Sequence, residues 1–436
     1  MRRNNMRNWE KIYQEKLCTP EQAAQVIHDG EWFFCGSRQA TSTLRAIWNR
    51  TDLHDAHYYA GQVENADFIF NSPAGKDAYI LTGFLGSRTL PYFYEGKIHY
   101  SPGHFSCASK RVEEYLHAGI ALACVSKPNK DGYVSFGNSA DYMAYTIHNA
   151  RVKICEINDQ LPFILGSNVM HISEFDMIVE GESVPLAETV IDADASNEKY
   201  KAIGGYLSEL LEDGATIEIG IGRLNSAAML HLDGVKDLGV HTEVFGDAMM
   251  DLIERGVITN SCKSINRGVS ICTQVVGTHK LMKWATENQG LQMVPATYAC
   301  SPAIICQNRK MTAINNAINV DLFGQVNAES LKNRQFTGMG GIGDFSKGAT
   351  LCPDGKSIIV VESTTKNDAI SKIVPFFTPG TPVSVPRTDI EYVVTEYGIA
   401  KLAGASITEK AHALINIAHP KFRDELIEQA KQMNIY

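Results

Sequence analysis

Short apolar runs alternate with amphipathic stretches along most of this chain. The apolar runs predict strands at residues 120–125, 152–157, 217–220, 357–361 and 392–395. Runs that are apolar on both faces are typical of strands in a parallel sheet that helices cover on both sides. Many of these runs end in a Gly, Ser, Thr or Glu that begins a loop. The pattern therefore predicts an α/β protein with open, doubly wound sheets.

The order of the predicted elements occurs twice. In each copy a helix leads to an Asp-Gly pair, an apolar strand and a further glycine, with the same spacing after Asp-Gly. The first copy occupies residues 19–36 and opens with a capping box that has proline at the first helical position. The second copy occupies residues 200–220. The repeat predicts two related α/β domains, residues 1–190 and 191–436, with a boundary where polar and small residues interrupt the pattern.

Composition narrows the class of protein. A chain of 436 residues favours two domains over one. A net charge of −9 argues against nucleic acid or an anionic membrane as the main partner. The ten cysteines include no C-x-x-C pair, which favours free thiols in a reducing compartment. No apolar run is long enough to span a membrane, and the basic residues 1–7 lack the apolar segment of a secretory signal. We therefore expect a cytoplasmic protein.

One carboxylate stands where a strand is expected to give way to a helix. Residues 241–247 read His-Thr-Glu-Val-Phe-Gly-Asp, and we expect a strand to end at Val240 and a helix to cover residues 244–253. In open α/β sheets, reactive groups collect at the carboxyl ends of strands. Glu243 is therefore a base, a nucleophile or an inert helix-start charge, and taken alone the last reading is favoured. A helix start would also help to keep its carboxylate ionised.

Two glycine-containing segments are candidate ligand loops. The first is Gly220-Ile221-Gly222-Arg223-Leu224, whose N–H groups and arginine could approach an anion, although a tight strand-to-helix turn explains its spacing equally well. The second, residues 338–343, contains Gly338, Gly340, Gly341 and Gly343. So many glycines give up much backbone entropy on ordering, which favours a loop that passes close to a ligand.

Three polar residues follow or precede expected strands. Lys366 comes after the strand at 357–361 and could meet a phosphate, although an exposed lysine is the simpler reading. Glu396 ends the strand at 392–395 and is a second loop carboxylate. Asn315 lies before an expected strand at 318–323 and could donate to a developing oxyanion, although such residues more often make turns.

Taken together, these segments resemble the acetyl-CoA hydrolase/transferase family, and within it the branch of 4-hydroxybutyrate and butyrate CoA-transferases. The resemblance covers nearly the whole chain. It includes residues 126–137, which are similar to the family stretch S-x-P-x-x-x-G-Y-x-S-x-G, and residues 156–160. In the second half it includes the segments around Glu243, Asn315, the two glycine loops, Lys366 and Glu396. The combination is specific, whereas each piece alone is not.

The resemblance implies a fold of two related α/β domains, assembled as a homo-oligomer such as a dimer, with coenzyme A held in a cleft. It implies that Glu243 is the catalytic glutamate and that Asn315 is the oxyanion residue. It also implies CoA contacts from both glycine loops and from Lys366. The implied CoA contacts are Gly220, Ile221, Gly222, Arg223, Leu224, Gly338, Gly340, Gly341 and Lys366.

The implied activity is transfer of coenzyme A between a short-chain acyl-CoA and a carboxylic acid. The acyl-CoA would be 4-hydroxybutyryl-, butyryl- or acetyl-CoA, and acetate would be a typical acceptor. Preserving the free energy of the thioester requires a covalent carboxylate relay that bypasses water, here a glutamyl-CoA thioester on Glu243. The implied reaction needs no metal and no permanently bound cofactor, because acyl-CoA is itself the substrate.

The chain departs from the family pattern at two places. Ala403-Gly404 stands where the family commonly has Arg-Gly, and Asn225 stands where a proline usually follows the first CoA loop. The first departure puts CoA phosphate binding at that position in doubt. Neither touches the expected nucleophile.

Other functions remain open at this stage. An acyl-CoA hydrolase would use the same glutamate with water as the final acceptor. A binding module would not require the carboxylate, and a sugar-phosphate isomerase would not explain the second glycine loop. The residues that line the acyl pocket cannot be ranked from the sequence. Four aromatic candidates are as easily core residues: Tyr58, Phe84, Tyr100 and His104.

Overall fold

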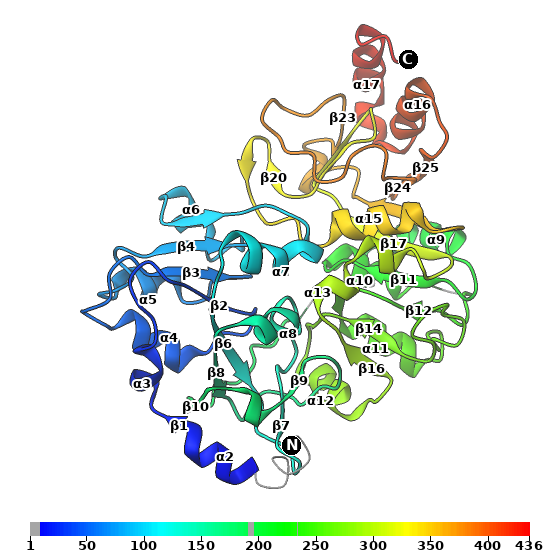
Figure 1. Cartoon of the computed structure of the whole chain (residues 1–436). Coiled ribbons are helices and arrows are strands. Elements are labelled where there is room, and N and C mark those ends of the chain that lie inside the picture. Colours follow the sequence, from blue (N-terminus) through cyan, green and yellow to red (C-terminus); the bar gives the residue numbers. More distant parts are fainter. Residues whose placement is uncertain (1–8, 191–195, 233) are drawn as a thin grey trace. The chain divides into compact units, whose positions relative to one another are not determined.

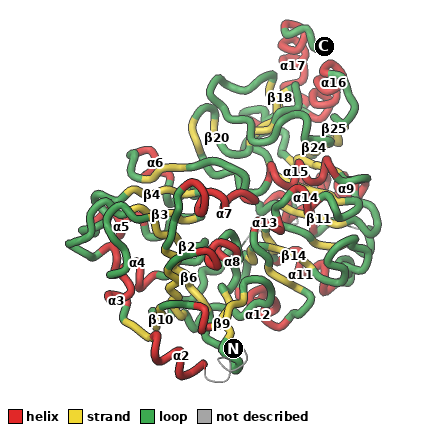
Figure 2. Tube along the Cα trace, viewed as in Figure 1, coloured by secondary structure: helices red, strands yellow, loops and turns green. Residues whose placement is uncertain are grey.

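The computed structural model describes residues 9–190, 196–232 and 234–436, and the basic stretch at residues 1–7 lies outside this range. The chain divides into two compact units, Met1–Glu188 with Thr273–Tyr298, and Thr189–Cys272 with Ala299–Tyr436. The sequence pattern did not indicate that residues 273–298 belong with the first unit. Figures 1 and 2 show that each unit combines a sheet with helices and long loops.

The first unit is built on an eight-stranded sheet in the order β1-β10-β8-β6-β2-β3-β4-β5, and every neighbouring pair is parallel. The strands are β1 (Leu17–Cys18), β2 (Trp32–Cys35), β3 (His57–Ala60), β4 (Tyr79–Thr82), β5 (Ile98–Tyr100), β6 (Ile120–Val125), β8 (Val152–Ile157) and β10 (Met177–Glu180). The helices include α2 (Trp9–Lys16), α3 (Pro20–Ala24), α4 (Thr41–Trp48), α5 (Ala66–Asn71), α6 (Leu90–Tyr94), α7 (Ala108–Lys110), α8 (Met143–Thr146) and α12 (His279–Glu287). An antiparallel pair, β7 (Tyr133–Ser135) and β9 (Val169–His171), lies outside the main sheet.

The second unit contains a six-stranded sheet in the order β12-β11-β17-β22-β24-β25, which is parallel except for its last strand. Its strands are β11 (Thr216–Ile219), β12 (Gly239–Val240), β17 (Met311–Asn316), β22 (Lys356–Val360), β24 (Tyr392–Thr395) and β25 (Gly398–Lys401). Its helices include α9 (Glu198–Leu210), α10 (Arg223–Met229), α11 (Asp247–Glu254), α14 (Pro302–Ile305), α15 (Ile342–Leu351), α16 (Ile407–Ile417) and α17 (Pro420–Gln432). A small sheet is formed by β18 (Asn319–Asp321), β19 (Val326–Asn327) and β23 (Ile373–Val374).

The two units share the repeat that the sequence predicts. In both, the Asp-Gly turn places its glycine at a φ of 74°, a left-handed conformation that suits glycine (Gly30 and Gly214). The strand after each turn lies between the next strand along the chain and a later one: β2 lies between β3 and β6, and β11 lies between β12 and β17. Each sheet therefore reverses its winding direction beside the repeated strand, and the predicted α/β doubly wound class is confirmed.

Several predicted elements are confirmed and others are wrong. The runs at 120–125, 152–157 and 392–395 are β6, β8 and β24, and the capping box of Thr19 and Gln22 forms as expected. The helix expected from residue 244 begins at Asp247, because Val244 and Phe245 are extended and form β13. The strand expected at 318–323 is present as β18, which covers Asn319–Asp321, but Asn315 before it does not lie in a turn: it belongs to β17, a central strand that the pattern missed.

Each unit has its own apolar core. One cluster includes Phe33, Trp48 and Tyr58 of the first unit, and another includes Val393, Leu414 and Leu426 of the second.

Among the described residues, no helix is both long and apolar enough to cross a membrane. The cysteines are all free thiols, and most are buried as small apolar residues, whereas Cys107 and Cys262 are exposed.

Candidate active site

The candidate residues of the second unit gather at one edge of its sheet. Gly220 directly follows β11, Glu243 lies shortly after β12, and Asn315 is near the end of β17. These three strands are neighbours and run parallel, so their carboxyl ends share one edge. This is the edge at which open α/β sheets bind ligands, beside the point where the strand order reverses.

Glu243 is held by the second glycine loop. Its Oε2 atom accepts a hydrogen bond of 2.6 Å from the N–H of Gly341, which is the N-cap residue of α15. On its other side, the N–H of Thr242 donates to the carbonyl of Ile271 at 2.9 Å. A Cβ atom added to Gly341 would collide with Oε2 of Glu243, whereas one added to Gly340 would lie 3.6 Å from both carboxylate oxygens. The loop therefore needs glycine at residue 341 because a carboxylate occupies the space of a side chain.

The surroundings of Glu243 favour its neutral form. Burial, with a smaller contribution from the nearby carboxylate of Asp344, raises the pKa of this carboxyl from its ordinary value to about 7. The N–H of Gly341 acts in the opposite direction, because it stabilises the charged form. The expectation from the sequence that a helix start keeps Glu243 ionised is therefore wrong, because the net effect of its surroundings is to raise its pKa. A helix start is present, but desolvation of the carboxylate outweighs one hydrogen bond.

Asn315 is oriented by a carboxyl group that the sequence analysis missed. Its Nδ2 atom donates to Oε2 of Glu218 at 2.7 Å, and Glu218 is only 2% exposed in the middle of β11. Burial, and secondly repulsion by Glu243, hold the pKa of Glu218 well above its usual range, which favours the neutral form of this carboxyl. An acidic residue inside an otherwise apolar strand was the one signal in the sequence that could have identified it.

The amide of Asn315 retains a donor for a ligand. A primary amide carries two N–H groups, and Glu218 accepts one of them. Within the described parts of the chain, the second N–H group of Asn315 has no acceptor. A Cβ atom at Gly220 would lie 2.5 Å from Oδ1 of Asn315, so the first glycine of the loop is needed to accommodate this side chain.

The first glycine loop is anchored by the residue that replaces the family's proline. Asn225 is buried, and its Nδ2 atom donates to the carbonyls of Gly220 at 2.9 Å and Ile314 at 3.3 Å. Gly222 has a φ of 156°, and a Cβ atom there would collide with the amide of Asn316. The loop leads directly into α10, which begins at Arg223, while Ile221 is 50% exposed. The departure at Asn225 therefore adds anchoring hydrogen bonds to the loop.

Two of the other candidate residues are placed only in part. Lys366 begins a short 3-10 turn, Lys366–Asp368, but its side chain lies outside the described part of the structure. Gly338 is buried a few residues before Gly341. The roles of Lys366 and Gly338 therefore stay predictions.

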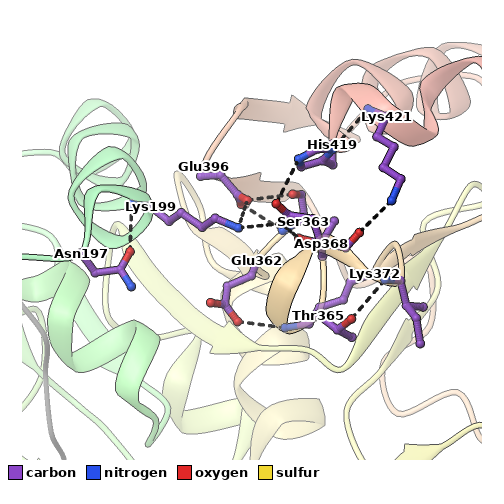
Figure 3. A network of polar contacts seen from close by, with 12 residues as sticks. Asn197, Lys199, Glu362, Ser363, Thr365, Asp368, Lys372, Glu396, His419 and Lys421 are labelled. Carbon is purple, nitrogen blue, oxygen red and sulfur yellow. Dashed lines mark hydrogen bonds and ion pairs between the residues drawn. The ribbon is translucent and has the colours of Figure 1, made fainter.

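Glu396 belongs to a separate polar network at the ends of β22 and β24 (Figure 3). Its carboxylate accepts hydrogen bonds from the N–H of Ser363 at 2.9 Å and from its Oγ at 2.7 Å. Lys199 lies 3.4 Å from the same carboxylate and 3.1 Å from Asp368, which His419 also approaches. Both oxygens of Glu396 are thus engaged by neighbouring groups, whereas Glu243 is held by a single backbone N–H.

Other residues named from the sequence lie elsewhere. Tyr58 is fully buried in the core of the first unit between Phe33 and Trp48, so it is a core residue and not part of a pocket lining. Ala403 and Gly404 line a hollow of about 420 Å³ with Arg387 and Lys410. Glu391, which precedes β24, lines the same hollow, so it opens at the amino edge of the sheet and not at the edge of Glu243. In the described ranges, no group of His, Cys, Asp and Glu side chains could hold a metal ion.

Comparisons with known proteins identify the family of this chain. Two family models match: the acetyl-CoA hydrolase/transferase N-terminal domain over residues 1–188 and the corresponding C-terminal domain over residues 277–430. The 4-hydroxybutyrate coenzyme A transferase of Clostridium kluyveri is 36% identical, over 97% of this chain and 99% of its own. The butyryl-CoA:acetate CoA-transferase of Anaerostipes caccae is 33% identical, over 98% and 99%. The crystal structure of RipA from Yersinia pestis superposes with a TM-score of 0.89 at 32% identity, covering 98% of this chain and all of that one.

Proposed function

The chain belongs to the acetyl-CoA hydrolase/transferase family as a CoA-transferase, and we propose that it moves coenzyme A between a short-chain acyl-CoA and a carboxylic acid through a glutamyl-CoA thioester. The donor would be 4-hydroxybutyryl-, butyryl- or acetyl-CoA, and the acceptor an acid such as acetate. The observation that supports the mechanism is the Glu243 carboxylate, held by the N–H of Gly341 at the carboxyl edge of the sheet.

In the proposed first step, an ionised oxygen of Glu243 attacks the thioester carbonyl and the C–S bond breaks. The products are an acyl-glutamyl anhydride and CoA thiolate. The thiolate then attacks the glutamyl carbonyl, so that the acid leaves as its carboxylate and the enzyme carries a glutamyl-CoA thioester. An incoming carboxylate reverses both steps and leaves with the CoA. The electron pairs balance without any redox partner.

Each tetrahedral intermediate in this sequence carries an oxyanion. The second N–H of Asn315 and the amides of the glycine loop are the donors that we assign to it. A single donor of this kind typically contributes about 3–4 kcal/mol to the transition state. The raised pKa of Glu218 supports this assignment, because the neutral form that it favours accepts from Asn315 without adding a negative charge beside the developing oxyanion.

We assign coenzyme A to the loop of residues 220–224, the loop of residues 338–341 and Lys366. The glycines of both loops leave the backbone open to close approach. We further propose a homo-oligomer, such as a dimer, that works in the cytoplasm, where acyl-CoA substrates are made and used.

The raised pKa of Glu243 predicts an acid limb in the pH profile. Attack requires the carboxylate, so protonation below a pKa of about 7 removes the nucleophile. We expect kcat/KM for acyl-CoA to fall about tenfold for each pH unit below that value and to level off above it. Initial rates measured from pH 5 to 9 test this. A profile that stays flat down to pH 5 would mean that the carboxyl titrates like an ordinary glutamate.

The covalent relay predicts ping-pong kinetics. CoA leaves the first acyl group before the second acid enters, so no complex holds both acids. Double-reciprocal plots of initial rate against acyl-CoA concentration, at several fixed acetate concentrations, should give parallel lines. Lines that intersect to the left of the vertical axis would indicate a ternary complex and exclude the double-displacement mechanism.

A hydrolase is the alternative, because Glu243 keeps partial contact with solvent. Water could then attack the anhydride or the thioester. Release of free thiol from acyl-CoA in the absence of acid, compared with formation of the new acyl-CoA when acid is added, separates the two activities.

A further inference from the structure

We propose that Lys263 is a positioning residue of the transfer reaction: its buried amine fixes the end of β12, the strand that leads to Glu243. The inference rests on the proposed function, because that function makes Glu243 the nucleophile. All the residues that carry it belong to the second unit.

The strand β12 is an edge strand, so one side of it has no neighbouring strand in the six-stranded sheet. On the inner side, the N–H groups of Gly239 and His241 donate to the carbonyls of Ala215 and Ile217 at 2.8 and 3.1 Å. The N–H and the carbonyl of Val240, which lies between them, therefore point away from the sheet. Backbone groups at such an edge need partners from outside the strand ladder.

Two side chains of one loop take the place of a neighbouring strand at Val240. The Oδ1 atom of Asn260 accepts from the N–H of Val240 at 2.8 Å, and the amine of Lys263 donates to its carbonyl at 2.7 Å. The same amine donates to the carbonyl of Val269 at 2.7 Å, directly before β14 (Ser270–Cys272). Lys263 therefore ties the end of β12 to the start of β14.

This connection leads directly to the nucleophile. The carbonyl of Ile271, in β14, accepts from the N–H of Thr242 at 2.9 Å, and Glu243 is the next residue. The two segments that meet at this contact are thus held together by one amine at Val240 and Val269. Movement of either segment would shift the carboxylate, and a displacement of about 1 Å at a reacting group can cost about 100-fold in rate.

A lysine at this place is unfavourable for stability alone. Its side chain is 3% exposed, and among the described residues no carboxylate pairs with it. Burial lowers the pKa of the amine to about 7, because the charged form is removed from water. The thiol of Cys272 acts on the amine electrostatically, but burial raises the pKa of that thiol, so it supplies no negative charge. A methionine would fill the same space without a buried charge, so the two hydrogen bonds explain why a lysine is present.

Gly239 makes room for the stem of this lysine. A Cβ atom added to Gly239 would collide with the Cγ atom of Lys263 and would lie 2.9 Å from its Cδ atom. The φ of Gly239 is outside the left-handed region, so the backbone itself does not require glycine there. The requirement comes chiefly from the lysine, and the strand and the side chain are fitted to each other.

The test compares two methionine substitutions, each of which keeps a long side chain and removes an amine. Lys263→Met should lower kcat/KM for acyl-CoA about 100-fold through misplacement of Glu243. The dissociation constant of desulfo-CoA should stay at the wild-type value and the melting temperature within a few degrees of it, because the CoA loops and the core are unchanged. Wild-type kcat/KM in Lys263→Met, or loss of turnover, binding and melting temperature in step, would overturn the proposal.

Lys356→Met is the matched control for this substitution. Lys356 begins β22 in the same unit, at the opposite edge of the sheet from Glu243, and pairs with Glu212 at 2.6 Å. Its side chain is mostly buried, so the change resembles Lys263→Met in size and surroundings. It should leave kcat/KM close to wild type.

Gly239→Ala tests the same contact while keeping the amine. The new methyl group displaces the stem of Lys263, so kcat/KM should fall in this variant too. The double substitution Gly239→Ala/Lys263→Met should be no slower than Lys263→Met alone, because both changes remove one interaction. Additive losses in the double variant would show that the two residues act separately and would overturn the proposal.

Hydrogen exchange gives a readout that does not need transfer. Peptides that contain residues 239–243 should exchange faster in Lys263→Met than in wild type, whereas peptides from β17 and β22 should keep their protection. If the wild type transfers no CoA, the proposed function fails, and the exchange still decides whether Lys263 fixes the end of β12. Unchanged exchange at residues 239–243 would overturn that role.

Discussion

Substituting Glu243 with alanine is expected to abolish CoA transfer, with kcat/KM at least about 10⁴-fold below wild type, because the covalent relay has no other carboxylate at its position. Initial-rate assays with acyl-CoA and acetate measure the loss. The second loop carboxylate supplies the control: in Glu396→Gln the side chain keeps an acceptor for Ser363, so transfer should persist.

Chemical trapping distinguishes the two glutamates directly. Incubation with acyl-CoA and no acceptor should leave a glutamyl-CoA thioester, which borohydride reduces to an alcohol at Glu243. Peptide mapping should find this change in wild type and in Glu396→Gln, but not in Glu243→Ala. A reduced residue mapped to Glu396, or transfer near the wild-type rate in Glu243→Ala, would exclude the assignment.

Substituting Gly341 with valine is expected to impair turnover far more than folding. The new Cβ atom would collide with the end of the Glu243 side chain and not with backbone. The carboxylate can rotate away at small cost to stability, but it then loses the 2.6 Å hydrogen bond that positions it. We expect kcat/KM to fall at least about 100-fold, comparable to other lost positioning contacts, while the melting temperature stays within a few degrees of wild type.

Gly205→Val is the matched control for this substitution. Gly205 is an exposed residue of α9 with nothing within 4 Å of an added Cβ atom, so valine there should leave both turnover and stability close to wild type. Loss of thermal stability and activity in step in Gly341→Val would instead show that the glycine loop is a structural turn.

The apolar pattern predicts strands well where burial is complete on both faces. The runs at 120–125, 152–157 and 392–395 became β6, β8 and β24, and those at 217–220 and 357–361 became β11 and β22 with a shift of one residue. In β17, by contrast, the pattern missed the strand that contains Asn315, and in β11 it predicted the strand but not the role of Glu218. Those polar side chains are buried because they bond to each other across neighbouring strands, and no one-dimensional pattern contains that contact.

The sequence by itself determined the α/β class, the repeated winding of the two units and the residues at the carboxyl ends of the strands. These follow from local hydrophobic periodicity and from turn chemistry, which act between neighbours in the chain. Only the tertiary structure decided that Gly341 contacts Glu243 across 98 residues, that burial raises the pKa of this carboxyl to about 7, and that Glu218 orients Asn315. Desolvation and long-range pairing depend on which atoms surround a group in space, and only the folded chain determines that.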